Sequence, residues 1–238
     1  MRAMTLALPG IITAPFNWQS YGLADACVAL TSWEARLMTE VFGARREKTH
    51  VVPNGVEDVF LDSRPVQRGP WLVCTATITE RKRVLELAEA AVRAKAPLWI
   101  IGKPYSENDP YGQRFLQLAR EHPAMIRYEG AIGDRAKLAE AYRGARGFVL
   151  LSAMESLSLS ALEAAGCGCP LLLSDLPWAR TVFGPDASYC PVPSSADRTA
   201  ECLRQFYAGA PDLRPPPKPL TWLEVGQQLK RLYESLVR

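Results

Sequence analysis

Residues 151–170 read LSAMESLSLSALEAAGCGCP, and three kinds of local structure are predicted to follow one another within this stretch. An apolar run with strand character ends at Leu151, and a polar loop that carries Glu155 comes next. A helix is predicted to open near Leu157 and to run through Glu163 to a stop at Gly166. We therefore expect a strand–loop–helix unit, which is the building block of parallel α/β sheets.

The first turn of this predicted helix is a candidate anion site. Its backbone N–H groups have no partner inside the helix, and the positive end of the helix dipole adds to them. Glu155 precedes the turn, and Glu163 lies about two helical turns further along. Carboxylates only accept hydrogen bonds, so the pair would suit a ligand such as a nucleotide sugar, with hydroxyl groups on both sides of its phosphates. By spacing alone, two solvated acidic residues explain the pattern equally well.

Strand-like and helix-like segments alternate on both sides of this unit. A helical period recurs in residues 84–92, 115–119 and 138–142, each between apolar runs. Several of these runs are apolar throughout, which is typical of strands covered on both faces. The alternation predicts an α/β fold with a doubly wound parallel sheet over residues 70–208. The strands are predicted at Cys27–Leu30, His50–Val52, Trp71–Thr75, Leu98–Ile101, Met125–Tyr128, Phe148–Leu151 and Pro170–Leu173.

The two ends of the chain are organised differently from this domain. Residues 1–52 hold about two helices and two strands, too few for a domain of their own. Five prolines between residues 209 and 219 predict an extended connector, because proline can continue neither a helix nor a strand ladder. Residues 220–238 are predicted to form an amphipathic helix that needs an apolar surface to lie on. The apolar side of this helix would carry Trp222, Val225, Leu229, Leu232, Tyr233 and Leu236.

Two helix starts carry the pattern of a capping box. In that motif a hydroxyl side chain and a glutamate three residues later satisfy each other's backbone N–H groups. The pairs are Thr31 with Glu34 and Thr221 with Glu224. We therefore expect one helix to begin after Thr31 and another after Thr221.

Composition argues against several functional classes. Lys and Arg number 28 against 25 Asp and Glu, a net charge of +3, so neither a nucleic acid nor a membrane is expected as a partner. No apolar run reaches the roughly 18 residues of a membrane span, and the first run is broken by Pro9 and Gly10, unlike a signal peptide. The six cysteines are expected to be buried and reduced in a cytoplasmic protein. Cys167 and Cys169 lie too close for the usual zinc spacing, and no metal site is predicted.

The stretch 151–170 resembles the E-x7-E region of glycosyltransferase family 4, and further landmarks of that family follow in order along residues 24–238. They are ADACVALTS at 24–32, VPNGV at 52–56, TATI through Lys82 at 75–82, IIG at 100–102, YEGAI at 128–132, LAEAY at 138–142 and the last helix with Trp222 and Tyr233. Members of this family are retaining enzymes of the GT-B fold, in which two Rossmann-like domains lie on either side of a cleft.

The resemblance implies a role for each part of the chain. Residues 70–208 would be the Rossmann-like domain that binds a nucleotide sugar, and residues 1–52 a remnant of the truncated N-terminal, acceptor-side domain. Residues 53–69 would form the interdomain linker. Residues 209–219 would be the proline-rich connector, and residues 220–238 the crossover helix that returns to the N-terminal domain.

The resemblance also implies a role for each candidate site residue. Glu155 would contact the transferred sugar, and Lys82 would stabilise the leaving diphosphate. Glu163 would bind the ribose hydroxyl groups, and the backbone near Ile132 would meet the base. The remaining candidates are the backbone N–H groups that would hold the diphosphate and a further cation beside it: Leu157, Ser158, Leu159, Ser160 and Arg81.

This chain departs from the family pattern in several respects. Ala76-Thr77 stands where the family often has Gly-Arg, so one phosphate cation is missing unless Arg81 or Arg83 replaces it. Arg83 stands where a glycine usually follows the lysine, so this loop is expected to have a different shape. Most of the N-terminal domain, which holds much of the acceptor site, is expected to be absent. A solvated basic stretch before a helix is the alternative interpretation of residues 81–83.

We therefore expect a retaining glycosyltransferase that moves a sugar from a nucleotide diphosphate sugar to an acceptor hydroxyl group without a metal ion. The alternatives are a nucleotide-sugar-binding module, one subunit of a split transferase with little activity alone, or a fragment without function. The acceptor would be a carbohydrate or a lipid, and the sequence does not specify the sugar or the base. An exposed apolar side on the last helix predicts a homo-oligomer or a partner subunit that supplies the N-terminal domain.

Overall fold

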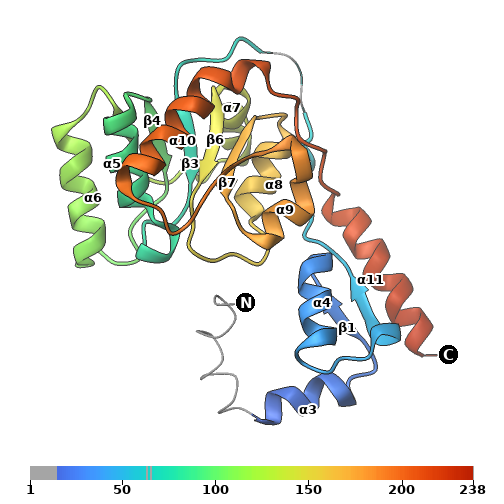
Figure 1. Cartoon of the computed structure of the whole chain (residues 1–238). Coiled ribbons are helices and arrows are strands. Elements are labelled where there is room, and N and C mark those ends of the chain that lie inside the picture. The colour runs from blue at the N-terminus through green and yellow to red at the C-terminus, as the bar shows by residue number, and fades with distance from the viewer. Residues whose placement is uncertain (1–14, 63, 65, 238) are drawn as a thin grey trace.

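The computed structural model describes residues 15–62, 64 and 66–237, which form one large and one small unit (Figure 1). The large unit is built on a six-stranded sheet in which every neighbouring pair is parallel. Its strand order is β5-β4-β3-β6-β7-β8. The strands are β3 (Leu72–Thr75), β4 (Leu98–Ile101), β5 (Ile126–Tyr128), β6 (Gly147–Leu150), β7 (Leu171–Ser174) and β8 (Ser188–Cys190). The doubly wound parallel sheet is therefore confirmed, and its order reverses between β3 and β6, the usual position of a ligand crevice.

The core of the large unit follows from the apolar runs. All four residues of β6 and of β7 are buried, as expected for central strands that are covered on both faces. Strand β8 was not predicted. It consists of Ser188, Tyr189 and Cys190 at the edge of the sheet, and so short and polar a segment carries little hydrophobic signal.

Helices cover both faces of this sheet (Figure 1). Helix α5 packs against α6 and α10, whereas α7 packs against α8. Most begin with a capping side chain, as Asp134 shows by accepting from the N–H groups of Ala136 and Lys137 at the start of α7. The helices are α5 (Val84–Ala94), α6 (Pro110–Glu121), α7 (Arg135–Gly144), α8 (Leu159–Gly166), α9 (Pro177–Phe183) and α10 (Ala196–Gly209).

The small unit contains the two helices and two strands expected within residues 1–52, and a short 3-10 helix that was not predicted. They are helix α3 (Pro15–Leu23), strand β1 (Cys27–Ala29), helix α4 (Ser32–Glu40), the 3-10 helix η1 (Arg46–Lys48) and strand β2 (Thr49–Val51). Strands β1 and β2 pair in parallel, and α4 contacts both of them and α9 of the large unit. Helix α4 begins after Thr31 as predicted, but the Glu34 carboxylate accepts from Leu30 N–H instead of Thr31 N–H.

The segment that leaves the large unit differs in part from the predicted connector. Helix α10 continues to Gly209, and the 3-10 helix η5 occupies Ala210–Asp212, so irregular chain begins only at Leu213. Helix α11 (Trp222–Leu236) then starts with the full capping box that was predicted for Thr221 and Glu224. A groove of about 540 Å³ between α11 and strand β2 shows that this helix returns to the small unit.

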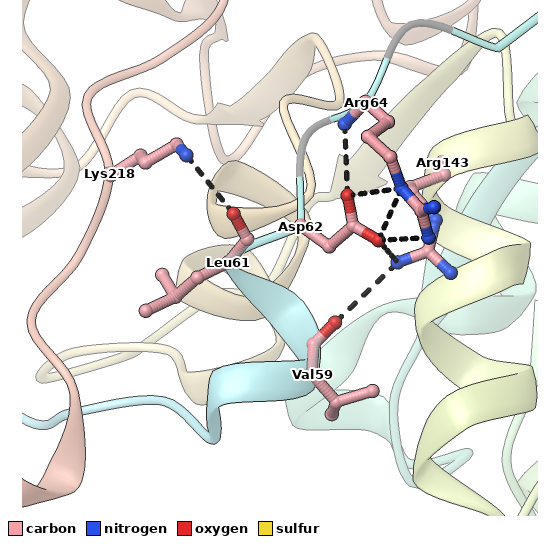
Figure 2. Close-up of polar contacts among 6 residues, drawn as sticks. All are labelled: Val59, Leu61, Asp62, Arg64, Arg143 and Lys218. Carbon is pink, nitrogen blue, oxygen red and sulfur yellow. Dashed lines mark hydrogen bonds and ion pairs between the residues drawn. The ribbon is translucent and has the colours of Figure 1, made fainter.

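The linker between the two units, residues 53–69, is held on the large unit by polar contacts (Figure 2). Arg143 of α7 donates to the Val59 carbonyl at 3.5 Å and lies 3.8 Å from the Asp62 carboxylate. Lys218 donates to the Leu61 carbonyl at 3.0 Å, which joins the linker to the C-terminal connector. The linker also contains the 3-10 helix η2 (Asp58–Phe60), which contacts both α7 and α8.

Candidate functional site

The candidate site lies where the sheet order reverses, beyond the carboxyl ends of β3 and β6. The loop after β3 contains the 3-10 helix η3 (Glu80–Lys82), and the loop after β6 leads to α8. The two loops are joined, because Ala153 N–H donates to the Arg81 carbonyl at 2.8 Å. The Arg81 side chain in turn donates to the Met154 carbonyl at 3.1 Å. Residues that the sequence places far apart therefore form one rim of the crevice.

Lys82 and Glu155 form an ion pair on this rim, with Lys82 Nζ donating to Glu155 Oε1. Their side chains are only 16% and 10% exposed. Arg81 Nη1 lies 3.7 Å from Glu155 Oε2, and its side chain is more than half exposed. Lys82 is thus not part of a solvated basic stretch, and three of the predicted site residues converge here.

The loop before α5 turns at Arg83, which has φ +53° and ψ +38°. This is the left-handed conformation that glycine adopts most easily. Arg83 therefore adopts here a conformation in which the glycine usual at this position would be less strained. Nearby, the loops after β3 and β4 meet backbone to backbone, because a Cβ on Gly102 would lie 1.9 Å from the Ala76 carbonyl oxygen.

Helix α8 begins at Leu159, two residues later than predicted, and Ser158 is its N-cap. Ser158 Oγ accepts from Ala161 N–H at 3.3 Å and lies 3.2 Å from Ser160 Oγ. In the part of the chain that the structure describes, no acceptor is found for the N–H groups of residues 157–160. Together with the helix dipole, these groups form a site that favours an anion.

Glu163 lies one helical turn into α8 and is buried, with 7% of the residue exposed. Arg135 Nη2 donates to its Oε1 at 2.5 Å, and Tyr142 Oη donates to its Oε2 at 3.1 Å. Burial raises the pKa of the Glu163 carboxyl, and the hydrogen bonds from Arg135 and Tyr142 partly oppose this shift. Neither Glu163 nor Glu155 is a solvated surface charge, so that alternative interpretation of the two acids is wrong.

Sequence reasoning missed the role of Arg135 beside Glu163. The local signal was a cation in the first turn of α7, where it opposes the helix dipole. A residue that contradicts a local rule in this way often serves the tertiary structure or a site. Ile132, the residue expected near the base, lies half-buried in the loop just before α7.

Two further side chains at the crevice were not predicted. Thr75 ends β3 and Ser152 follows β6, and both hydroxyl oxygens are buried. Ser152 Oγ has no hydrogen-bond partner among the described residues, whereas the Thr75 hydroxyl interacts with the Tyr142 hydroxyl. An unpartnered buried hydroxyl at the carboxyl end of β6, as at Ser152, is a candidate for a ligand contact.

The cysteines and the other potential metal ligands among the described residues are further candidates for a second site. All six cysteines are buried and free, and burial raises the pKa of Cys167 and Cys169 to about 12. No group of three or more His, Cys, Asp or Glu side chains gathers around a metal position within residues 15–237 as far as they are described. Among the same residues, no helix combines the length and apolar character needed to cross a bilayer.

Comparison with known proteins assigns the chain to a family. A family model described as "Glycosyl transferases group 1" matches residues 69–208. The D-inositol 3-phosphate glycosyltransferase of Acidothermus cellulolyticus is 31% identical in an alignment 171 residues long that covers 63% of this chain and 38% of that protein. The GtfA subunit of the UDP-N-acetylglucosamine–peptide N-acetylglucosaminyltransferase of Streptococcus pneumoniae is 26% identical in an alignment 192 residues long that covers 77% of this chain and 37% of that protein. The chain thus spans less than half the length of these relatives.

Solved structures show the same fold. The pneumococcal O-GlcNAc transferase GtfA in complex with UDP and GlcNAc superposes with a TM-score of 0.72 at 18% identity, over 94% of this chain and 48% of that chain. A chain of the GtfA/B complex superposes with a TM-score of 0.64 at 18% identity, over 94% of this chain and 48% of that chain. The large unit is accordingly the GT-B type of Rossmann-like domain that was predicted.

Proposed function

Because the chain belongs to the group 1 glycosyltransferases, we propose that it takes part in sugar transfer from a nucleotide diphosphate sugar to an acceptor hydroxyl group with retention of configuration, as in family 4. One observation carries this proposal. The Lys82–Glu155 pair, the unpartnered N–H groups of residues 157–160 and the buried Glu163 all lie along the crevice where the sheet order reverses. A cation, an anion site and two carboxylates in this order match the parts of a nucleotide diphosphate sugar.

The proposed roles follow the order of groups in such a donor. The diphosphate would lie on the first turn of α8, with Lys82 and Arg81 beside it. Glu155 would accept from hydroxyl groups of the transferred sugar, and Glu163 from those of the ribose. The backbone near Ile132 would contact the base. The candidates for the phosphate contacts are the N–H groups of Leu157, Ser158, Leu159 and Ser160.

Catalysis would rest on positioning and electrostatics. The bond between the anomeric carbon and the diphosphate breaks, and negative charge builds on the leaving oxygen. Lys82 and the first turn of α8 would stabilise that charge, because both present N–H donors that are already in place. The acceptor oxygen forms the new bond to the anomeric carbon, and its proton passes to the leaving diphosphate oxygen. We propose that no metal ion is needed for this charge stabilisation.

A binding experiment tests this proposal directly. Calorimetry of the purified chain with UDP, GDP and ADP and their glucose conjugates should identify at least one nucleotide that binds. The affinity of that nucleotide should fall in the Lys82→Ala variant. Wild-type protein that binds none of these compounds would overturn the proposal.

A second candidate function is a subunit of a split transferase with little activity alone. It is favoured by apolar side chains that α11 leaves exposed, because Trp222 is 46% and Tyr233 is 62% exposed. The related GtfA is itself described as a subunit and was solved in a GtfA/B complex. A donor-hydrolysis and transfer assay with the chain alone, against a panel of carbohydrate and lipid acceptors, separates the two functions.

We also propose a cytoplasmic location. All six cysteines are free and buried, which is usual in a compartment where thiols stay reduced. Measuring the location of a tagged chain by cell fractionation tests this proposal.

A further inference from the structure

Arg135 lies between the linker and the buried carboxylate of the candidate site. We propose that Arg135 positions Glu163 for the ribose of the donor and ties this carboxylate to the linker through Glu57. The inference rests on the proposed function, because it assigns to Arg135 a part in the same nucleotide site.

The contacts of Arg135 define its position closely. Its Nη2 donates to Glu163 Oε1 at 2.5 Å, and its Nε donates to Glu57 Oε1 at 2.7 Å. The centre of its guanidinium group lies 4.6 Å from the centre of the Phe60 ring. Phe60 is fully buried, and the two carboxylates bind different nitrogens of one planar group. Arg135 is therefore held on three sides before any ligand enters.

Phe60 also supports the second donor to Glu163. Its ring lies 6.0 Å from the Tyr142 ring in an edge-to-face arrangement. The backbone of Phe60 presses on α8 as well, since a Cβ on Gly166 would lie 2.6 Å from the Phe60 carbonyl oxygen. The linker thus touches both groups that donate to Glu163 and the helix that carries it.

The hydrogen bonds from Arg135 and Tyr142 leave the Glu163 carboxylate able to accept further hydrogen bonds. An ionised carboxylate has about four acceptor positions, two on each oxygen. Arg135 takes one on Oε1 and Tyr142 takes one on Oε2. One position remains on each oxygen, which matches the two hydroxyl groups of a ribose. The Glu163 side chain is 10% exposed, so this remaining edge is not fully closed.

Arg135 is also the cation that keeps this buried carboxylate charged. Burial is the main effect that raises the pKa of Glu163, and Arg135 is the main group that lowers it. The other titratable groups that act on Glu163 are Tyr142 of α7, Glu57 of the linker and Cys167 at the end of α8. None of these three carries a positive charge. Without Arg135, Glu163 would therefore become protonated at a higher pH and would lose acceptor positions.

The test compares UDP with 2′-deoxy-UDP by calorimetry between pH 6 and pH 8.5, using the full chain. Hydrogen bonds to a charged group predict that the wild type binds UDP at least about tenfold more tightly than the deoxy compound. In Arg135→Ala this ratio should shrink to about twofold and should fall further as the pH decreases. In the wild type the ratio should change less with pH. GDP or ADP and its 2′-deoxy form replace this pair if the wild type prefers that base.

Control variants separate positioning from folding. Arg135→Lys keeps the charge and should restore part of the ratio, and Glu57→Gln should lower it by a smaller factor than Arg135→Ala. Arg93→Ala removes an exposed arginine that pairs with Asp197 between α5 and α10, and it should leave the ratio unchanged. If Arg135→Ala does not fold, the Arg135→Lys and Glu57→Gln variants carry the test.

The outcomes are distinct. A ratio that stays at the wild-type value in Arg135→Ala, or an equal loss of affinity for both compounds, would overturn the role of Arg135 and leave the proposed function standing. A wild-type chain that binds none of the nucleotides would overturn the proposed function, and this inference with it.

Discussion

Lys82 donates a hydrogen bond to Glu155 although the two residues are 73 positions apart in the chain. Their side chains are only 16% and 10% exposed, so each of these buried charges is balanced by the other. A donor diphosphate would give Lys82 a second negative partner and would leave Glu155 free to accept from sugar hydroxyl groups. In this ion pair, Lys82 would already be positioned for a diphosphate and Glu155 for the hydroxyl groups of a sugar.

Lys82→Ala should weaken binding of UDP much more than binding of uridine, because the lysine charge would act on the phosphates alone. Calorimetry with both ligands measures the difference. Lys230→Ala is the matched control, because Lys230 is an exposed lysine of α11 with a side chain that is 75% exposed. Equal losses for UDP and uridine would contradict the phosphate role.

Glu163→Gln should weaken UDP binding by about 1.5–3 kcal/mol, the usual contribution of a hydrogen bond to a charged group. The amide keeps the shape of the side chain but replaces one acceptor oxygen by a donor. Calorimetry with UDP and 2′-deoxy-UDP measures both the loss and its dependence on the ribose hydroxyl. Glu140→Gln changes an exposed glutamate of α7 in the same way and should have no effect. Unchanged UDP affinity in Glu163→Gln would refute the ribose assignment.

The same substitution should change how the free energy of unfolding of the chain depends on pH. The pKa of Glu163 is raised in the folded state, so folding favours the protonated carboxyl. Its contribution to stability is present below the unfolded-state pKa and is lost as the pH rises through the folded-state pKa. In a plot of the free energy of unfolding against pH, Glu163→Gln should therefore remove the decrease that the titration of Glu163 causes. Urea unfolding at several pH values from 4 to 8 measures it, and identical curves for both proteins would contradict the prediction.

Arg83→Gly should keep or raise the free energy of unfolding, by up to about 1 kcal/mol, because glycine adopts the left-handed conformation without a Cβ clash. Arg83→Val should lower it, because a β-branched side chain fits poorly at positive φ. Urea unfolding of the three proteins measures the order. A valine variant as stable as the glycine variant would show that the turn is not strained.

The exposed apolar side chains of α11 should cause self-association or bind a partner subunit. Trp222 and Tyr233 are 46% and 62% exposed. Light scattering after size-exclusion chromatography should show an oligomer, and the double variant Trp222→Ser, Tyr233→Ser should shift it toward the monomer. Gln227→Ser changes an exposed polar residue of α11 and is the control. A monomeric wild type that transfers sugar efficiently would contradict this prediction.

Local patterns in the sequence were sufficient to predict most of the strands and the helix starts. Apolar runs predicted β3, β4, β6 and β7 to within about a residue, because buried central strands need continuous hydrophobic side chains. The capping box at Thr221 predicted the start of α11, because that motif depends only on residues three positions apart. Strand β8 was not predicted, because its three residues form a strand by pairing with β7 and carry no strand pattern of their own.

Only the tertiary structure decided how the site is assembled. Sequence spacing left Glu155 and Glu163 balanced between ligand contacts and solvated charges, and burial settled that both are enclosed. The partners of these acids, Lys82 and Arg135, come from the ends of other strands and helices, 73 and 28 positions away. The physical reason is that a parallel sheet gathers the carboxyl ends of distant strands at one edge, and strand order is fixed by packing of the whole domain.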